Sequence, residues 1–144
     1  MSIADVMSTR LVYVAPEATA LEAIRRMAEA GVGSVAVCDG SRLVGIFTER
    51  DVLRLAGEAA ALDQVRVAEA MTRDVVTASA DTELVAAARL MGERKIRHLP
   101  VVEGENLLGM IGIRDVLAAL AERLWRSRDE DVHETVHELL ARRR

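Results

Sequence analysis

A threonine and an aspartate, Thr48 and Asp51, stand three residues apart where a predicted strand gives way to a predicted helix. The first turn of a helix carries free backbone N–H groups and a partial positive charge, which suit an anionic ligand. A carboxylate in that turn can accept hydrogen bonds from both hydroxyls of a ribose, and the threonine hydroxyl can bond to ribose or phosphate. The same pair also fits a capping box, which only closes the helix end. The residues alone leave both interpretations open.

A second candidate is the basic run Lys95-Ile96-Arg97-His98, which precedes a predicted strand. Arginine makes bidentate contacts to phosphate and lysine supplies a point charge, so the run could hold a phosphate chain. Ordinary surface charge on a solvated turn explains the run equally well.

The segment His133-Glu134-Thr135-Val136-His137 matches the H-E-x-x-H pattern of zinc peptidases. A catalytic zinc needs a third protein ligand, usually downstream, and seven residues follow His137. We therefore predict no metal site and no catalytic residue. A metal-dependent hydrolase is the least favoured alternative, and a charged amphipathic helix that pairs with a partner chain is the simpler interpretation.

The chain contains an internal repeat with an offset of 64 residues, which places Asp51 opposite Asp115. Other identical pairs are Met7 and Met71, Met27 and Met91, and Gly45 and Gly109. Thr48, however, corresponds to Gly112, so one hydroxyl is missing from the second copy.

Both copies predict the same order of elements: a strand, a helix, two strands joined by a tight turn, and a second helix. The predicted strands of the first copy are Leu11–Val14, Ser34–Cys38 and Leu43–Phe47, with the second helix starting near Glu49. Those of the second copy are Val75–Ala78, His98–Val102 and Leu107–Ile111, with the second helix starting near Ile113.

The predicted fold class is α+β, with two β-α-β-β-α repeats packed through their sheets and a C-terminal helical tail. The expected boundaries are 1–60 for the first repeat, 61–120 for the second and 121–144 for the tail. One repeat of about 55 residues buries too little surface to be stable alone, so we expect the copies to pack together.

Composition narrows the class of function. The 144 residues carry a net charge of −4, which does not favour a nucleic-acid partner. The single cysteine, Cys38, excludes an intrachain disulfide and fits a reducing compartment. The N-terminus lacks the pattern of a secretory signal, and no apolar run reaches the ~20 residues that span a bilayer. We expect a cytoplasmic protein without a membrane partner.

Each copy resembles a CBS domain, the module named after cystathionine β-synthase, and the pair resembles a stand-alone tandem CBS protein. The segments that carry the resemblance in the first copy are Asp5–Ser8, Gly31–Val37 and Gly45–Val52. Those in the second copy are Glu69–Thr72, Lys95–Val102 and Gly109–Val116. The resemblance implies a regulatory module that binds adenosine-containing ligands in two clefts between the copies, and that forms a homodimer through its helices.

The resemblance also implies which residues bind the nucleotide. The cleft of Asp51 would be lined by Thr48, Thr72, Arg73, Val75 and Val76. The cleft of Asp115 would be lined by Leu11 and Val12, and the resemblance places Arg97 and His98 near a ligand phosphate. Because Gly112 replaces a hydroxyl residue, we expect the Asp115 site to be weaker, different or empty.

We therefore expect a non-enzymatic sensor that binds AMP, ADP or ATP, requires no cofactor, and signals by altered packing to an unidentified effector protein. S-adenosylmethionine is the alternative ligand. A scaffold dimer with vestigial ligand clefts is the alternative function.

Overall fold

The structure, a computed structural model, describes residues 1–126 and 130–142, so residues 127–129 and 143–144 of the predicted tail lie outside the described residues. We call the stretch before the first helix of each repeat its leading segment. The chain forms two compact units, and each contains part of the leading segment of the other repeat. Unit 1 comprises Met1–Thr9, Thr77–Glu103 and Leu108–Arg144, and unit 2 comprises Arg10–Val76 and Gly104–Leu107.

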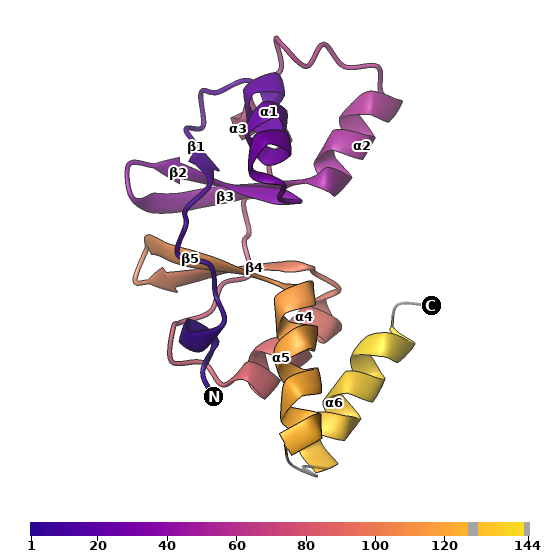
Figure 1. Ribbon diagram of the computed structural model, residues 1–144. Helices are drawn as coiled ribbons and strands as arrows, with labels where there is room; N and C mark the ends of the chain where they lie inside the picture. Colours follow the sequence, from indigo (N-terminus) through magenta and orange to yellow (C-terminus); the bar gives the residue numbers. More distant parts are fainter. Residues whose placement is uncertain (127–129, 143–144) are drawn as a thin grey trace. The chain divides into compact units, whose positions relative to one another are not determined.

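Unit 2 contains most of the first repeat. Its elements are β1 (Tyr13–Val14), α1 (Ala20–Ala30), β2 (Ser34–Asp39), β3 (Arg42–Thr48), α2 (Glu49–Gly57) and α3 (Val67–Ala70). Strand β1 pairs in parallel with β2, and β2 pairs antiparallel with β3, with a register shift between Val37 and Cys38. Helices α1 and α2 cover one face of this sheet (Figure 1).

The ends of α1 follow from its sequence. The Thr19 side chain accepts a hydrogen bond from the Glu22 N–H at 3.1 Å, which satisfies one free donor of the first turn. Gly31 ends the helix in the left-handed conformation, with φ of 66°. The counterpart of Gly31 is Lys95, which ends its helix with φ of 56° although it carries a side chain. The two repeats therefore share a backbone path that their residue types alone do not require.

The core of unit 2 lies between α1, α2, α3 and the sheet. Its buried residues are Val14, Ala20, Ala23, Met27, Val35, Val37, Phe47, Leu55, Val67 and Ala70. The core is built from aliphatic side chains around one aromatic ring, Phe47, which is fully buried.

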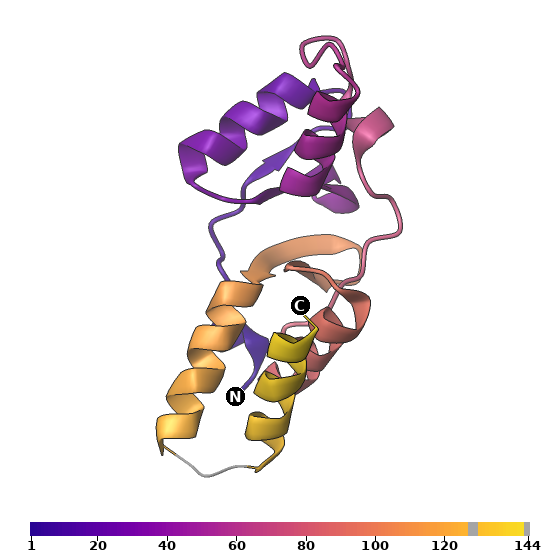
Figure 2. The same cartoon turned by 90° about the vertical axis from the view of Figure 1, so that its right-hand side faces the viewer.

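Unit 1 contains most of the second repeat and the tail. Its helices are the 3-10 turn Ile3–Asp5 and α4 (Leu84–Arg94), α5 (Ile113–Arg126) and α6 (Glu130–Ala141). Its strands are β4 (His98–Glu103) and most of β5 (Asn106–Gly112), whose first residues belong to unit 2, where Asn106 pairs antiparallel with Arg42 of β3. Helix α6 returns along α5 and α4 (Figure 2).

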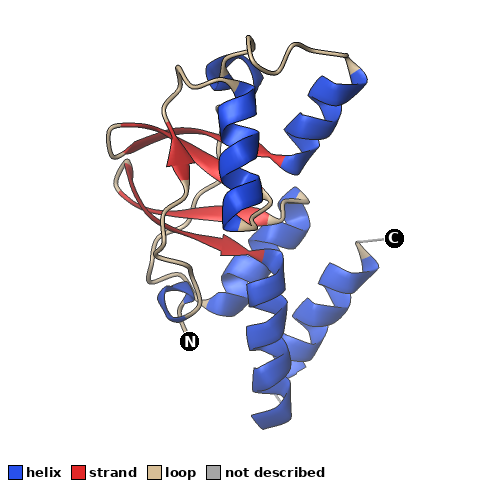
Figure 3. Ribbon diagram, turned by 45° about the horizontal axis from the view of Figure 1, so that its top comes forward, coloured by secondary structure: helices blue, strands red, loops and turns tan. Residues whose placement is uncertain are grey.

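The predicted α+β class, with two similar repeats and a C-terminal helix, is confirmed (Figure 3). The predicted strand at Val75–Ala78 is wrong, because Ala78 forms only an isolated parallel bridge to Val101. The first strand of the other repeat is also shorter than predicted, since β1 contains Tyr13 and Val14 alone. In both repeats the leading segment is held by a few long-range hydrogen bonds rather than by a full strand ladder.

Candidate functional site

Thr48 and Asp51 meet at the N-terminus of α2. They form a capping box in which Asp51 Oδ2 accepts a hydrogen bond from the Thr48 backbone N–H at 2.9 Å. The Asp51 side chain is 12% exposed, so the carboxylate is largely withdrawn from bulk water while part of it remains accessible. The capping interpretation is therefore confirmed, and the capping hydrogen bond fixes the direction in which the Asp51 carboxylate points.

Arg54 holds the other oxygen of the same carboxylate. Its Nη2 lies 3.5 Å from Asp51 Oδ1 and donates to the backbone oxygen of Ala70 at 3.0 Å. Its Nη1 lies 3.8 Å from a carboxylate oxygen of Glu58. A carboxylate offers about four acceptor positions, so these contacts leave Asp51 with capacity for a ligand. Sequence reasoning missed Arg54, although a spacing of three residues on a helix places it beside Asp51.

The leading segment of the second repeat is hydrogen-bonded to β3 in the same unit. Thr72 and Ile46 exchange two backbone hydrogen bonds, of 2.9 and 3.0 Å. Gly45 permits this approach, because a Cβ there would overlap the Met71 side chain and lie 3.0 Å from the Thr72 backbone oxygen. Thr72, which is exposed, is therefore tied to the strand that ends at Thr48.

The remaining residues predicted for the Asp51 site also lie in unit 2. Val75 and Val76 are half-buried. Arg73 is exposed, and its Nη2 donates to the Ala68 backbone oxygen at 2.8 Å, so its guanidinium already stabilises the leading segment.

Leu11 and Val12 belong to unit 2, whereas Asp115 belongs to unit 1. The Val12 backbone oxygen accepts from the Ala36 N–H at 3.2 Å, and Leu11 is 40% exposed. Their assignment to the Asp115 site stays a prediction.

The second helix N-terminus, in unit 1, repeats the backbone but not the side chains. The Ile113 N–H donates to the Arg97 backbone oxygen at 2.8 Å, as the Glu49 N–H donates to Gly33 at 3.0 Å. Asp115 is exposed, and the residue before the helix is Gly112. A Cβ on Gly112 would lie 3.7 Å from Asp115 Oδ2, which is ordinary contact. Space therefore does not explain the missing hydroxyl.

The two basic residues predicted to bind phosphate, Arg97 and His98, lie in unit 1. Arg97 is exposed, and His98 is the half-buried first residue of β4. Their backbone position is fixed by the hydrogen bond from Ile113 described above.

The other candidate reactive residues are the two histidines of α6 and the single cysteine. Among residues 1–126 and 130–142, no cluster of three or more His, Cys, Asp or Glu side chains could hold a metal ion. His133 and His137 are both exposed on α6. Burial raises the pKa of the Cys38 thiol above its ordinary value, which disfavours the reactive thiolate. Within the described part of the chain, no helix is both long and apolar enough to cross a membrane.

These features define a duplicated α+β module with one carboxylate at the start of the last helix of each repeat. The CBS domain model matches residues 3–58 and 67–122, and the chain belongs to the CBS domain family. The sequence resemblance is thereby confirmed.

Known proteins resemble the chain over most of its length. A 33.4 kDa protein in the ribosomal RNA operon of Thermofilum pendens is 42% identical over 107 residues, which are 74% of this chain but 35% of that protein. A CBS-domain protein from Burkholderia ambifaria MC40-6 superposes with a TM-score of 0.78 at 31% identity, covering 83% of this chain and 93% of the other. The protein CBSX2, solved in complex with AMP, superposes with a TM-score of 0.74 at 30% identity, covering 84% and 96%.

Proposed function

We propose that this chain is a regulatory module that binds an adenine nucleotide at Asp51 and has no catalytic role of its own. The observation that carries the proposal is the largely buried Asp51 carboxylate, which the Thr48 N–H and Arg54 orient at the first turn of α2. A carboxylate held in this way can accept hydrogen bonds from both hydroxyls of a ribose.

The other residues follow from their places around that carboxylate. Thr48 would contribute its hydroxyl, Thr72 would contact the ligand from the leading segment, and Val75 and Val76 would supply apolar surface to a purine. Arg73 would act through the Ala68 contact that stabilises this segment. The complex of CBSX2 with AMP supports an adenosine ligand, because that protein matches 84% of this chain.

In unit 1, we assign phosphate binding to Arg97 and His98 and a weaker ligand site to Asp115. The exposed Asp115 carboxylate is less restricted in direction than the largely buried Asp51 carboxylate. Asp115 therefore loses more conformational freedom when a ligand binds. Arg97→Ala is expected to weaken ATP binding more than adenosine binding.

The proposal is tested by melting the nucleotide-free protein with AMP, ATP and S-adenosylmethionine. A ligand that binds only the folded state raises the melting temperature with its concentration. We expect a saturable rise with AMP or ATP that Asp51→Ala removes. An unchanged melting temperature with all three ligands would overturn the proposal. A rise with S-adenosylmethionine alone would identify that compound, rather than a nucleotide, as the ligand.

The alternative function is a scaffold with vestigial sites, which Gly112 and the exposed Asp115 favour in the second repeat. In either case, we propose a cytoplasmic homodimer whose packing is read by an effector protein. The lone cysteine supports a reducing compartment.

A further inference from the structure

Three arginines and a tyrosine of unit 2 are exposed beside the edge strand of its sheet. Strand β1 pairs with β2 and lies at the edge of the sheet. Tyr13 of β1 is 45% exposed, and Arg10, in the leading segment before it, is also exposed. Arg25 and Arg26 are exposed on α1. We call these four residues the Arg/Tyr surface.

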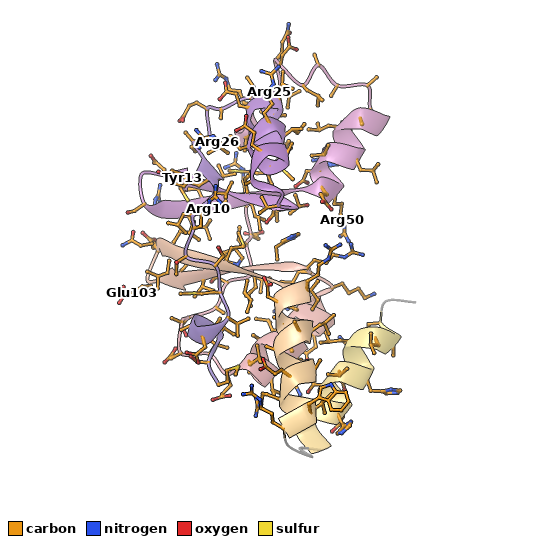
Figure 4. The ribbon with its side chains drawn as sticks, in the orientation of Figure 1. Arg10, Tyr13, Arg25, Arg26, Arg50 and Glu103 are labelled. Atoms are coloured by element: carbon orange, nitrogen blue, oxygen red, sulfur yellow. The ribbon has the colours of Figure 1, made fainter. Side chains whose placement is uncertain are left out.

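A hydrogen bond between α1 and β1 fixes the centre of the Arg/Tyr surface. Arg26 Nη1 donates to the Tyr13 backbone oxygen at 3.1 Å. Arg10 precedes Tyr13 by three residues, a stretch that spans at most about 10 Å when fully extended. Figure 4 shows all four side chains on the β1 side of unit 2, Arg25 and Arg26 from α1 and the other two from the chain around β1. One short ligand can therefore contact them together.

The three arginines are not neutralised by ion pairs within the chain. Glu22 and Glu29 stand four residues from Arg26 and Arg25 on α1, a spacing at which ion pairs form readily. Within the described ranges of the chain, however, Arg10, Arg25 and Arg26 form no ion pair. Each guanidinium carries five N–H groups, so the surface keeps free donors for an anionic ligand.

The second repeat does not carry an equivalent surface. Its residues at the 64-residue offset from Arg10, Tyr13, Arg25 and Arg26 are Asp74, Thr77, Arg89 and Leu90. Because the two repeats have the same order of elements, the fold does not require arginine or tyrosine at these positions. The concentration of positive charge in the first repeat therefore needs an explanation other than folding.

We propose that the Arg/Tyr surface binds an acidic segment of a protein partner. Arginine makes bidentate hydrogen bonds to carboxylates, and exposed tyrosine and arginine are the residue types that contribute strongly to protein interfaces. Carboxylates of the segment contact the three guanidinium groups, and its backbone or an apolar side chain packs on the Tyr13 ring. The proposal rests on the proposed function only for the existence of an effector protein, and it requires no nucleotide at Asp51.

Charge and composition favour a peptide over a nucleic acid as the partner. The whole chain carries a net charge of −4, which repels a polyanion that extends beyond the three arginines. Proteins that bind single-stranded nucleic acid combine a basic groove with several aromatic side chains on which bases stack, whereas this surface contains one aromatic ring. A short segment with a few carboxylates matches three arginines without a longer basic track.

Selection from a displayed library of random peptides tests the chemistry of the partner. The full-length parent protein is the bait, and peptides that also bind the Arg25→Gln/Arg26→Gln double variant are removed. We expect the remaining peptides to be enriched in Asp and Glu. Remaining peptides without that enrichment, or no peptide that prefers the parent protein, would overturn the proposal.

Fluorescence anisotropy of the most enriched peptide then tests the individual residues at low ionic strength. Arg10→Gln and Arg25→Gln should each weaken binding about two- to fivefold, as expected for exposed ion pairs. Tyr13→Ala should weaken it further by removing the ring. The matched control is Arg89→Gln, at the equivalent position of the second repeat, and it should leave the affinity unchanged.

The arginine variants separate binding from folding. Arg25 has no hydrogen bond or ion pair to another described residue, so Arg25→Gln should leave the melting temperature unchanged. Replacing every Asp and Glu of the peptide by Asn and Gln should abolish binding. Unchanged affinity in Arg25→Gln, an equal loss in Arg89→Gln, or binding of the neutral peptide would overturn the proposal.

Peptide binding and nucleotide binding can fail independently. Asp51→Ala should remove AMP binding and leave peptide binding intact, whereas Arg25→Gln should do the reverse. AMP binding without selection of an acidic peptide would overturn the Arg/Tyr surface alone, and the opposite result would count against the nucleotide site alone. A labelled oligouridylate that binds more tightly than the acidic peptide and is released by Arg25→Gln would make the partner a nucleic acid, which also overturns the proposal.

Discussion

The starts of α2 and α5 occupy equivalent positions in the two repeats but differ in what they hold. At α2, Thr48 and Asp51 close a capping box and Arg54 engages the carboxylate. At α5, Gly112 supplies no hydroxyl, Asp115 is exposed, and Ala118 stands in place of Arg54. The backbone hydrogen bond at the first helical residue is nevertheless present at both ends. Duplication thus preserved the backbone while the oriented carboxylate is found only in the first repeat.

The comparison depends on the leading segments lying equivalently against β3 and β5. Ser8 and Met110 exchange backbone hydrogen bonds of 2.9 and 3.1 Å, as Thr72 and Ile46 do. A Cβ on Gly109 would lie 2.7 Å from the Ser8 backbone oxygen, whereas at Gly45 the nearest atoms belong to the flexible Met71 side chain.

The largest expected effect on stability is that of Gly109→Ala. We expect it to lower the free energy of unfolding by about 2–3 kcal/mol, because the backbone must move. Gly45→Ala should lower it by about 1–2 kcal/mol, since Met71 can change rotamer. Urea denaturation monitored by circular dichroism measures both. If neither substitution lowered the free energy of unfolding measurably, the leading segments would not approach β3 and β5 as closely as described.

A smaller effect is expected at the caps themselves. Thr48→Ala should lower the free energy of unfolding by about 1 kcal/mol, because the first turn of α2 loses its side-chain cap. Gly112→Ala is the matched change at α5, where no hydroxyl is lost and the added Cβ has room. Thermal or urea unfolding of the pair measures the difference, and a larger loss at Gly112 would reverse the comparison.

The smallest effect is expected at Arg54, whose side chain is 47% exposed and therefore screened by solvent. Arg54→Ala should weaken nucleotide binding about twofold by freeing the Asp51 carboxylate, which corresponds to about 0.4–0.5 kcal/mol. Arg54→Lys should restore part of the affinity, whereas Arg50→Ala, one turn earlier on α2, should leave it unchanged. Titration calorimetry distinguishes these variants, and equal losses at Arg50 and Arg54 would contradict the positioning role.

Local pattern predicted the central strands and helices well. The predicted strands Ser34–Cys38 and Leu43–Phe47 are β2 and β3 with at most one added residue at each end, and the helices near Glu49 and Ile113 begin at those residues. The two strands are short apolar runs joined by a tight turn at Gly40, and the helices carry an apolar stripe, so local sequence is sufficient to indicate both.

The leading segments and the contact of Arg54 with Ala70 could not be predicted in the same way. Val75–Ala78 is apolar enough for a strand, but only Ala78 finds a bridging partner. The spacing of three residues on a helix could have placed Arg54 beside Asp51, but its hydrogen bond to the backbone oxygen of Ala70, sixteen residues away, is a long-range contact about which a side-chain pattern carries no information. The change from Thr48 to Gly112 predicted a difference between the two repeats, but not that Asp115 is exposed whereas Asp51 is largely buried.

Titration calorimetry of nucleotide-free protein with AMP tests the central claim most directly, using Asp51→Ala and Asp115→Ala as a matched pair. We predict one tighter site per chain, weakened about 10- to 100-fold by Asp51→Ala, because a hydrogen bond to a charged group contributes about 1.5–3 kcal/mol. Asp115→Ala should leave that site unchanged. Equal losses in the two variants, or tight binding that survives Asp51→Ala, would contradict the account.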